Sequence, residues 1–308
     1  MRAPVKAAIQ GAFSRLPGGP HLYRHLTRGR MGTQASHIDK LAKAWGSYAD
    51  TWTRYGIDLN GKQIWMHDGG WTPYPVILAY LLTGSGARIT MWEGELEDQY
   101  AAKSVEFGLK QKFGSVEVPE ARYEKLRSLQ GASSAEIVKV LGGEWRRTDR
   151  VLPQMEADSV DLLTTGGVLE HFRPAELDAF LAHTRGILRQ GGWASHTFDM
   201  RDHLYHADKR IPFLNHLRYS DPVYSALFGH RLGYHNRLLP GELRSAIERA
   251  GFEVVAMRRR ILPAERYVES PDEFRDALVG LDRAKLAPRF QAATDEDLRT
   301  VAVQFLCR

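Results

Sequence analysis

The chain of 308 residues has a single cysteine, Cys307, so no disulfide can form within it. Chains without disulfides are usual in reducing compartments, and we expect a cytoplasmic location. No apolar run approaches the roughly 20 residues that a membrane-spanning helix needs, so we expect no transmembrane segment. Residues 1–20 carry basic side chains but no apolar core of a secretory signal, and we expect this segment to be retained.

Acidic residues are missing from the start of the chain, where the first one is Asp39. The net charge of +5 is mild, and 43% hydrophobic and 26% charged residues are ordinary for a globular protein. The basic segment before Asp39 could attract an anionic substrate, nucleic acid or a membrane. The alternative, which we favour, is a solvated helical cap. No heptad repeat, zinc-type Cys/His spacing or RNA-binding aromatic motif supports a nucleic-acid partner. The basic residues that precede Asp39 are Arg2, Lys6, Arg15, Arg24, Arg28 and Arg30.

The central segment, residues 158–203, has the pattern of one β-α-β unit. Val160–Thr164 and Trp193–Phe198 are short apolar runs typical of buried strands, and Gly191-Gly192 is expected to stop the helix between them. Such units build a mostly parallel sheet whose ligands lie beyond the carboxyl ends of its strands, here Thr164–Gly167 and Phe198–His203. The helical face is predicted from Leu177, Phe180, Leu181, Thr184 and Leu188.

The rest of the chain alternates predicted strands and helices, which indicates an α/β fold. Further strands are expected at Lys62–His67, Ala87–Trp92, Glu144–Thr148, Phe252–Met257 and Val301–Leu306, with the last two antiparallel. Helices are expected at Ile38–Tyr55, Pro75–Leu82, Leu96–Lys112, Ala121–Leu141 with a break at 131–134, Pro240–Ala250 and Pro271–Leu281. Residues 1–56 are expected to form short helices, broken at Pro17–Pro20. One of these helices has an aromatic face, formed by Trp45, Tyr48 and Trp52 with Leu41, which packs on the sheet or acts as a substrate lid.

Three features of the central segment stand out: Asp161 in its strand, Leu169-Glu170-His171 soon after it, and the turn Leu188–Gly192. Together they resemble the class I S-adenosylmethionine-dependent methyltransferases, although Gln190 stands where proline is usual in that turn. A later stretch resembles a subset from bacterial saccharide and secondary-metabolite gene clusters. It comprises Ser195–His203, Tyr234–Arg237 and Ala250–Phe252.

The resemblance implies a Rossmann-like, seven-stranded, mostly parallel sheet with helices on both faces, and S-adenosylmethionine as the cofactor. We expect a helical cap at 1–56 and a methyltransferase domain at 57–308, with an acceptor-recognition insertion after the fifth strand at 204–238. The implied activity is biosynthetic transfer of a methyl group to an O or N atom of a small-molecule or saccharide acceptor. A homo-oligomer or a protein partner stays open.

The methyl-donor loop is expected at Asp68-Gly69-Gly70, between the first strand and the helix after it. Glycine there lets the backbone approach the cofactor closely. The loop of the resembled family reads acidic-x-Gly-x-Gly, whereas here Asp68 takes the place of the first glycine and Met66 that of the acid. Either Asp68 has taken over the hydrogen bonds of that acid, which we favour, or cofactor binding is impaired.

Other donor contacts are expected at the ends of the following strands. Glu93 is placed to accept hydrogen bonds from the ribose hydroxyls, Glu95 competes for that role, and a solvated loop carboxylate is the alternative for either. Asp149 is the candidate acceptor for the adenine amino group, with a capping or surface role as its alternative. Thr165 and Gly166 are expected to line the cleft beneath the donor.

Acid-base chemistry is expected just past the fifth strand, at Asp202-His203, because a carboxylate can fix an imidazole tautomer and raise its basicity. Arg201 is expected to hold an anionic acceptor or to form a plain salt bridge. We expect no metal here, because strand alternation sends His196 and Thr197 to opposite faces and the spacing fits no closed metal site. The polar residues of this stretch are His196, Asp199, Arg201, Asp202, His203 and His206.

Two further groups are assigned to loops. Glu170 is expected to orient loops by accepting from backbone amides at the start of the next helix, and His171 to be structural or to contact the acceptor. The insertion has aromatic and polar residues that would suit a sugar or a flat ring, or would form a small auxiliary core. Its predicted acceptor-binding residues are Tyr234, His235, Asn236 and Arg237. Outside the insertion, the basic run Arg258–Arg260 is interpreted as a solvated strand end.

Two other protein classes compete with a methyltransferase. The altered loop at Met66 and Asp68 also fits a non-catalytic member of the same fold that acts as a partner or scaffold subunit. An oxidoreductase is less favoured, because no complete Gly-x-Gly-x-x-Gly follows the first predicted strand.

Overall fold

The computed structural model describes residues 3–19, 22–23, 26, 34–67, 71–91, 96–113, 116–147, 155–207, 210–230, 232–261, 266–268 and 282–308. The chain divides into two compact units. The first unit comprises Met1–Arg30, Gly167–Ala182 and His196–Cys307, and the second comprises Met31–Gly166, His183–Ser195 and Arg308.

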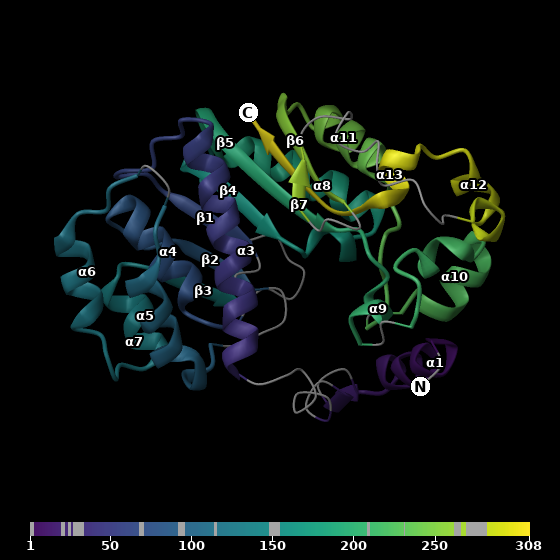
Figure 1. Cartoon of the computed structure of the whole chain (residues 1–308), viewed down its shortest axis with the longest axis horizontal. Helices are drawn as coiled ribbons and strands as arrows, with labels where there is room; N and C mark the ends of the chain where they lie inside the picture. Colours follow the sequence, from purple (N-terminus) through teal and green to yellow (C-terminus); the bar gives the residue numbers. More distant parts are fainter. Residues whose placement is uncertain are drawn as a thin grey trace. The chain divides into compact units, whose positions relative to one another are not determined.

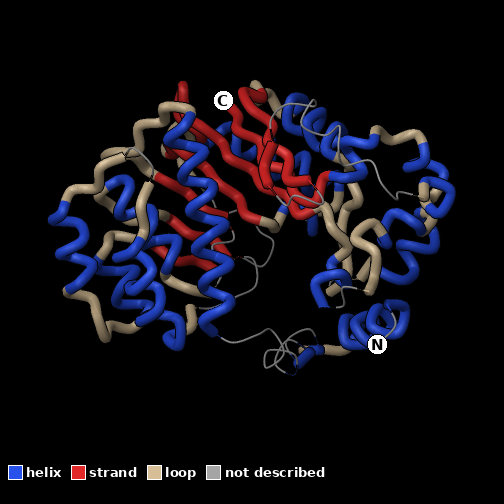
Figure 2. The backbone as a smooth tube through the Cα atoms, in the orientation of Figure 1, coloured by secondary structure: helices blue, strands red, loops and turns tan. Residues whose placement is uncertain are grey.

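One mixed sheet of eight strands has the order β3-β2-β1-β4-β5-β8-β6-β7. The pairings β1·β2, β1·β4 and β2·β3 are parallel, and β6·β8 and β6·β7 are antiparallel (Figures 1 and 2). The predicted α/β fold with an antiparallel finish is confirmed, and β7 is added to the seven expected strands. The strands are β1 Ile64–His67, β2 Arg88–Met91, β3 Glu144–Arg147, β4 Val160–Gly166, β5 Leu188–Asp199, β6 Val254–Ile261, β7 Arg266–Val268 and β8 Thr300–Cys307.

The second unit is built around α4 (Tyr74–Thr83), all of whose residues are buried. A helix that is apolar on every side must be enclosed, and α4 packs against α3, α5, α6 and α7. A Cβ added at Gly108 of α5 would lie 2.5 Å from Ile77, so only glycine lets α5 approach α4 this closely. The helices of this unit are α3 Gln34–Arg54, α4, η1 Asp98–Tyr100, α5 Ala101–Lys110, α6 Glu120–Arg127 and α7 Ser134–Val140.

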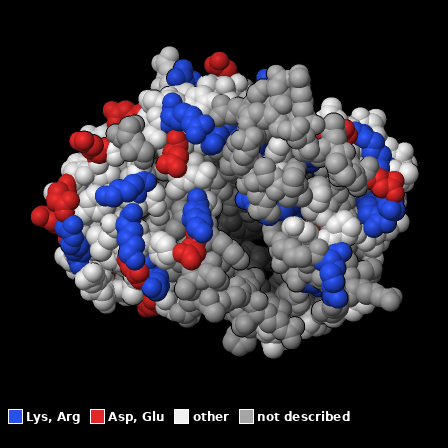
Figure 3. Space-filling view, viewed as in Figure 1, with Lys and Arg blue, Asp and Glu red and all other residues white. Residues whose placement is uncertain are grey.

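The exposed surface of α5 and α6 has charges of both signs. Glu106 forms ion pairs with Lys103 and Lys110, and Arg127 forms one with Glu120. Figure 3 shows the same interspersion of Lys and Arg with Asp and Glu over this part of the second unit. The described residues here therefore form no surface of a single charge.

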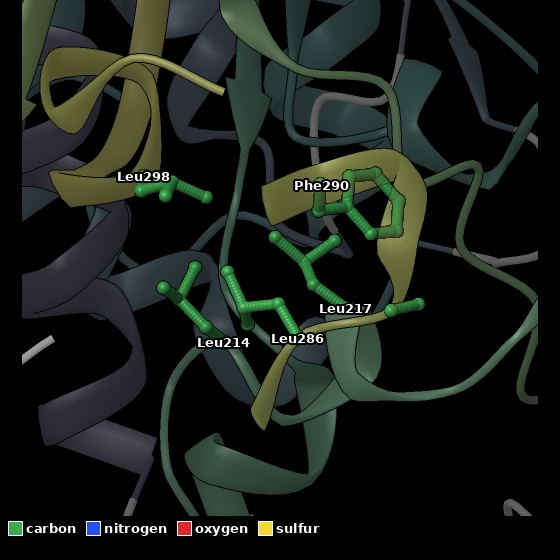
Figure 4. Packing of buried hydrophobic residues seen from close by; sticks show 6 residues of the cluster. Leu214, Leu217, Leu286, Phe290 and Leu298 are labelled. Carbon is green, nitrogen blue, oxygen red and sulfur yellow. The ribbon is translucent and has the colours of Figure 1, made fainter. Parts of the chain in front are cut away.

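The first unit packs its short helices around two small cores. One contains Leu214, Leu217 and Phe290 (Figure 4), and the other joins Ala7 of α1 to Tyr224 and Phe228 of α10. Both cores use residues of the insertion, so its aromatics do form auxiliary cores. The helices are α1 Ala3–Arg15, η2 Leu169–His171, α9 His203–Ala207, η3 Asn215–Arg218, α10 Asp221–Phe228, α11 Pro240–Arg249, η5 Arg283–Lys285, α12 Pro288–Gln291 and α13 Asp295–Arg299, while α8 Pro174–Ile187 has residues in both units.

Two predicted boundaries were wrong. The helix α8 ends at Ile187 and β5 begins at Leu188, so Gly191-Gly192 lies within β5 instead of stopping the helix. The apolar Leu188 fitted the helical spacing, but a buried strand start is equally apolar. A Cβ at Gly192 would lie 2.9 Å from the Arg189 carbonyl oxygen, which explains the need for glycine there.

The basic run Arg258–Arg260 is not a solvated strand end, because it lies inside β6 and pairs with β8. Arg258 is buried, and its Nη1 donates to Gln304 at 3.2 Å. Arg259 forms an ion pair with Glu296 at 2.5 Å. Charge alone suggested exposure, whereas partners on neighbouring elements allow burial.

The remaining predictions concern the N-terminal helices, the domain boundary and a helix near the C-terminus. Helices expected in residues 1–56 are present as α1 and α3, but α3 has 21 residues and is not short; α1 belongs to the first compact unit and α3 to the second. The domain boundary at 56 stays a prediction. The helix expected at Pro271–Leu281 lies outside the described residues. No described helix is long and apolar enough to cross a membrane.

Candidate functional site

Most predicted donor-binding residues cannot be placed. Asp68, Gly69, Gly70, Glu93 and Asp149 lie outside the described residues, as does Glu95. Their assignment to the cofactor stays a prediction.

The end of β4 is described, and it has the expected Thr165 and Gly166. Thr165 is fully buried opposite His67 of β1. A Cβ at Gly166 would lie 3.5 Å from the Tyr48 ring and 3.6 Å from the Trp45 ring. The aromatic face of α3 therefore packs directly against the carboxyl end of β4, within the second unit.

The end of β1 carries a buried imidazole that the sequence analysis missed. Nδ1 of His67 lies 2.7 Å from Oγ1 of Thr90, which also accepts a hydrogen bond from Nε1 of Trp65 at 3.1 Å. Burial lowers the pKa of His67 to about 4, so the ring is neutral at pH 7. Met66 is fully buried between Ile89 and Thr164, and its thioether is at most a weak hydrogen-bond acceptor.

In the first unit, the predicted acid-base pair has a different arrangement from the one expected. Oδ1 of Asp202 accepts from the Leu204 backbone amide at 2.7 Å, and Oδ2 accepts from Nδ2 of Asn215 at 2.8 Å. The carboxylate thus holds the start of α9 and ties it to η3. An acid-base role of Asp202 with His203 stays a prediction.

Four imidazoles, those of His171, His203, His216 and His235, pack together in the first unit, and we call them the histidine cluster. The ring centroids of His171 and His203 are 4.6 Å apart, and those of His203 and His235 are 4.8 Å apart. His216 lies 5.0 Å from His235. Three of these residues were predicted site residues, and the fold brings them together from η2, α9 and the loop before α11. His216 was missed because no local pattern marks it.

Backbone carbonyls set the protonation of two of these rings. Nδ1 of His171 lies 3.0 Å from the Tyr234 carbonyl oxygen, and Nε2 of His235 lies 2.9 Å from the Asp199 carbonyl oxygen. A carbonyl only accepts, so each of these nitrogens donates. Burial, followed by the charges of His235 and Arg237, lowers the pKa of His216 well below its usual value.

A small cavity of about 50 Å³ adjoins the histidine cluster. Lys6 of α1 also reaches it, and burial lowers the pKa of this amine while the charge of Asp202 opposes the shift. The residues that line the cavity include Lys6, His171, Asp202, His203, His216 and His235. Basic and imidazole groups on these walls suit an anionic or oxygen-rich ligand.

The residues Tyr234–Arg237 tie the insertion to η2. The backbone amide of Asn236 donates to the Glu170 carbonyl at 2.7 Å, and its Nδ2 donates to the Leu169 carbonyl at 3.0 Å. Nη1 of Arg237 donates to the Tyr219 carbonyl at 2.7 Å. These contacts support the loop, and the predicted acceptor-binding roles of Tyr234, His235, Asn236 and Arg237 stay predictions.

Arg237 is held firmly although it is a charged residue in the interior. Its guanidinium stacks 4.0 Å from the Tyr224 ring centroid and forms an ion pair with Asp221. The backbone φ of 59° is in the left-handed region, which non-glycine residues rarely adopt. Burial lowers the pKa of Arg237, while the charges of Tyr224 and Asp221 oppose the shift.

Arg201 forms the plain salt bridge that was one of its two predicted roles. Its Nε and Nη2 donate to the two carboxylate oxygens of Asp199, each at 2.8 Å. Glu170, which is 2% exposed, accepts from the Asp199 backbone amide at 3.3 Å through Oε1. Glu170 therefore accepts from a backbone amide at the end of β5. The amide expected from the sequence was one at the start of the next helix.

No family model matches the chain, and neither does any curated protein. Solved structures are similar at low identity. One is an S-adenosylmethionine-dependent methyltransferase from Mesorhizobium loti, with 13% identity over 82% of this chain and 92% of that chain and a TM-score of 0.43. Another is geranyl diphosphate C-methyltransferase from Streptomyces coelicolor A3(2) in complex with Mg²⁺, geranyl diphosphate and S-adenosyl-L-homocysteine, with 12% identity over 88% and 81% and a TM-score of 0.44. A geranyl diphosphate methyltransferase in complex with SAM has 13% identity over 92% and 94%, with a TM-score of 0.44.

Proposed function

We propose that this protein is an S-adenosylmethionine-dependent methyltransferase that methylates an O or N atom of a small-molecule or saccharide acceptor. The strand order is the observation that carries the proposal. Four neighbouring strands, β3-β2-β1-β4, pair in parallel, and β8 lies between β5 and β6 and is antiparallel to β6. A mostly parallel sheet is what the resemblance of Asp161, Leu169-Glu170-His171 and Leu188–Gly192 implies, and the antiparallel end is the one expected for the last two strands.

The proposed donor site lies at the carboxyl ends of β1, β2, β3 and β4, where parallel sheets bind ligands. It includes Thr165 and Gly166, together with Asp68-Gly69-Gly70, Glu93 and Asp149. Gly166 fits a close approach of the cofactor because it adds no side chain beside the Tyr48 ring. The α3 aromatics at this edge would exclude water, which favours a reaction in which charge is dispersed.

The donor supplies a methyl group bound to a positively charged sulfur. The chain must align the acceptor and take up the proton that the acceptor O or N atom loses as its bond to carbon forms. We assign the proton to His203, which lines the cavity and is only partly buried. Arg201, His171 and Tyr234–Arg237 are the proposed acceptor contacts.

Isothermal titration with S-adenosylmethionine tests the proposal. We expect saturable binding at one site and competition by S-adenosylhomocysteine. Absence of binding at millimolar cofactor would overturn it. An acceptor screen of nucleotide sugars and pathway intermediates would follow a positive result.

A non-catalytic role as a partner or scaffold subunit is the second candidate. Met66 favours it, because this fully buried thioether replaces the acid that the family uses. S-adenosylhomocysteine that copurifies with the chain would contradict this second role and support the enzyme.

A further inference from the structure

We propose that Glu170, His171 and His203 of the first unit bind a divalent transition-metal ion. Each of the three residues offers one ligand atom, and these atoms all lie within 4.8 Å of one another. In a tetrahedral zinc site with bonds of about 2.1 Å, the ligand atoms lie about 3.4 Å from one another. A small rotation of the partly exposed imidazoles of His171 and His203 would bring the present ligand atoms to that separation. The site shares no residue with the donor site of the proposed function, but it uses His171 and His203, and a His203 that binds metal cannot also take up the acceptor proton that the proposed function assigns to it. The proposal reverses our expectation that the chain has no metal.

The fold brings these ligands together from two segments. Glu170 and His171 are neighbours in η2, and His203 is the first residue of α9. The T-shaped contact of the two rings, with planes at 66° and centroids 4.6 Å apart, holds both imidazoles at one place. Sequence spacing could not reveal the group, because 31 positions of chain separate His171 from His203.

The protonation of His171 suits a metal ligand. Its Nδ1 donates to the Tyr234 carbonyl at 3.0 Å, which leaves the lone pair on Nε2. Metal-bound histidines commonly donate their second ring nitrogen to a carbonyl or carboxylate, and this bond fixes the tautomer and the ring orientation. The loop Tyr234–Arg237 thus has a specific role as the outer support of the site.

The burial of Glu170 also favours a cation. Its side chain is 2% exposed, and a metal cation is one way to offset the cost of burying an ionised carboxylate. The Asp199 amide and the Asn236 amide hold Glu170 through its Oε1 and its carbonyl.

The donor atoms select the class of metal. Two imidazole nitrogens and one carboxylate suit Zn²⁺, Co²⁺, Fe²⁺ or Mn²⁺, whereas Mg²⁺ and Ca²⁺ prefer oxygen ligands throughout. Three protein ligands leave at least one position open. The adjoining cavity of about 50 Å³ has room for one or two water molecules, at about 30 Å³ each, or for an oxygen atom of a bound ligand. Lys6 on the same cavity would favour an anionic ligand.

Metal titration of the full chain tests the site without any methyl donor. After removal of bound metal with a chelator, Zn²⁺ and Co²⁺ binding is measured by calorimetry and by the visible absorption of Co²⁺, with Mg²⁺ titrated for comparison. We expect one equivalent of Zn²⁺ or Co²⁺ and much weaker Mg²⁺ binding. Glu170→Gln and His203→Gln should each weaken Co²⁺ binding on the order of 100-fold, at least as much as loss of an outer-shell partner.

Two further variants separate ligation from folding. His230→Gln is the matched control, because His230 belongs to the same unit and its Nδ1 lies 3.3 Å from Oγ of Ser14. This variant should bind metal like the wild type. His203→Asp keeps a ligand and should retain one equivalent with a shifted Co²⁺ spectrum. Wild-type uptake well below one equivalent would overturn the proposal, and so would equal affinity in Glu170→Gln, His203→Gln and His230→Gln. Failure to bind S-adenosylmethionine would leave the metal result unaffected.

Discussion

Two cavities lined by described residues, one in each unit, differ in size and in the groups on their walls. In the second unit, a cavity of about 250 Å³ lies along β1, β2 and β3, and its walls include Trp65, Arg88 and Glu144. The cavity of the first unit is only about 50 Å³, yet imidazoles, Asp202 and Lys6 line it. Arg88 and Glu144 are half exposed and 3.5 Å apart, whereas Asp202, His216 and His235 are buried. Volume is therefore a poor guide to where the chemistry of this chain is concentrated.

The two regions also keep their polar groups in place by different means. The end of β1 in the second unit depends on burial of a neutral imidazole, His67, beside Thr90. The first unit depends on charge-assisted and backbone hydrogen bonds that join η2, η3 and the loop Tyr234–Arg237. We therefore expect the first unit to lose stability when a hydrogen-bond partner is removed, and the second unit to lose stability when His67 is protonated.

Removal of Arg237 should have the largest effect on stability. Arg237→Ala would delete the charge-assisted hydrogen bonds to the His216 and Tyr219 carbonyls, each worth about 2 kcal/mol, and we expect a loss of about 4 kcal/mol. Urea unfolding measures the loss. The control is Arg244→Ala, which removes an exposed pair with Glu248 and should cost less than about 0.5 kcal/mol. Similar losses in both variants would remove the contrast between the two regions.

Acid should destabilise the second unit through His67. Its pKa is about 4 in the folded chain and about 6.5 when unfolded, so between these values only the unfolded chain takes up the proton. The stabilisation is complete above pH 6.5 and is lost as the pH falls towards 4, by about 3 kcal/mol. The measurement is the free energy of unfolding against pH for the wild type and His67→Gln.

The difference between these two proteins isolates His67 from the other buried histidines, including His216, whose pKa is also lowered. We expect the difference to change steeply between pH 6.5 and 4 and to be flat above that range. Parallel curves for the wild type and His67→Gln would show that this imidazole titrates normally.

Asp68→Asn tests the donor loop of the second unit. If Asp68 has replaced the family's acid, loss of its charge weakens hydrogen bonds worth about 2 kcal/mol, which lowers cofactor affinity on the order of 30-fold. Calorimetry with S-adenosylmethionine measures it. Glu97→Gln, which changes a described carboxylate that accepts a hydrogen bond from Gln99, is the control and should bind normally. Unchanged affinity in Asp68→Asn would favour the reading in which Asp68 has no cofactor role.

The architecture could largely be predicted from the sequence, because apolar spacing of strands and helices is a local property. The helix predicted at Pro75–Leu82 is α4, and the antiparallel last strands are β6 and β8. A three-residue strand such as β7 is too short to show a pattern. Leu188 was misassigned because an apolar residue suits a helix end and a buried strand start equally.

The candidate site could be predicted only in part. His203 was identified from its carboxylate neighbour Asp202, His235 from the composition of the insertion and His171 from the resemblance, but their packing depends on how the insertion folds. Lys6 and His216 have no local signal, because Lys6 lies in α1 and His216 in a turn of η3. Burial of Glu170 together with two imidazoles is a property of the tertiary structure alone.

The smallest expected effect belongs to Arg201, at the edge of the first region. Its ion pair with Asp199 has good geometry, but the two side chains are 17% and 19% exposed, so solvent screens the pair. Arg201→Gln should cost less than about 1 kcal/mol of unfolding free energy, measured in urea. A loss comparable with that of Arg237→Ala would mean that the network of buried bonds extends to Asp199. A small loss instead leaves Arg201 able to exchange Asp199 for an anionic acceptor, as the proposed function requires.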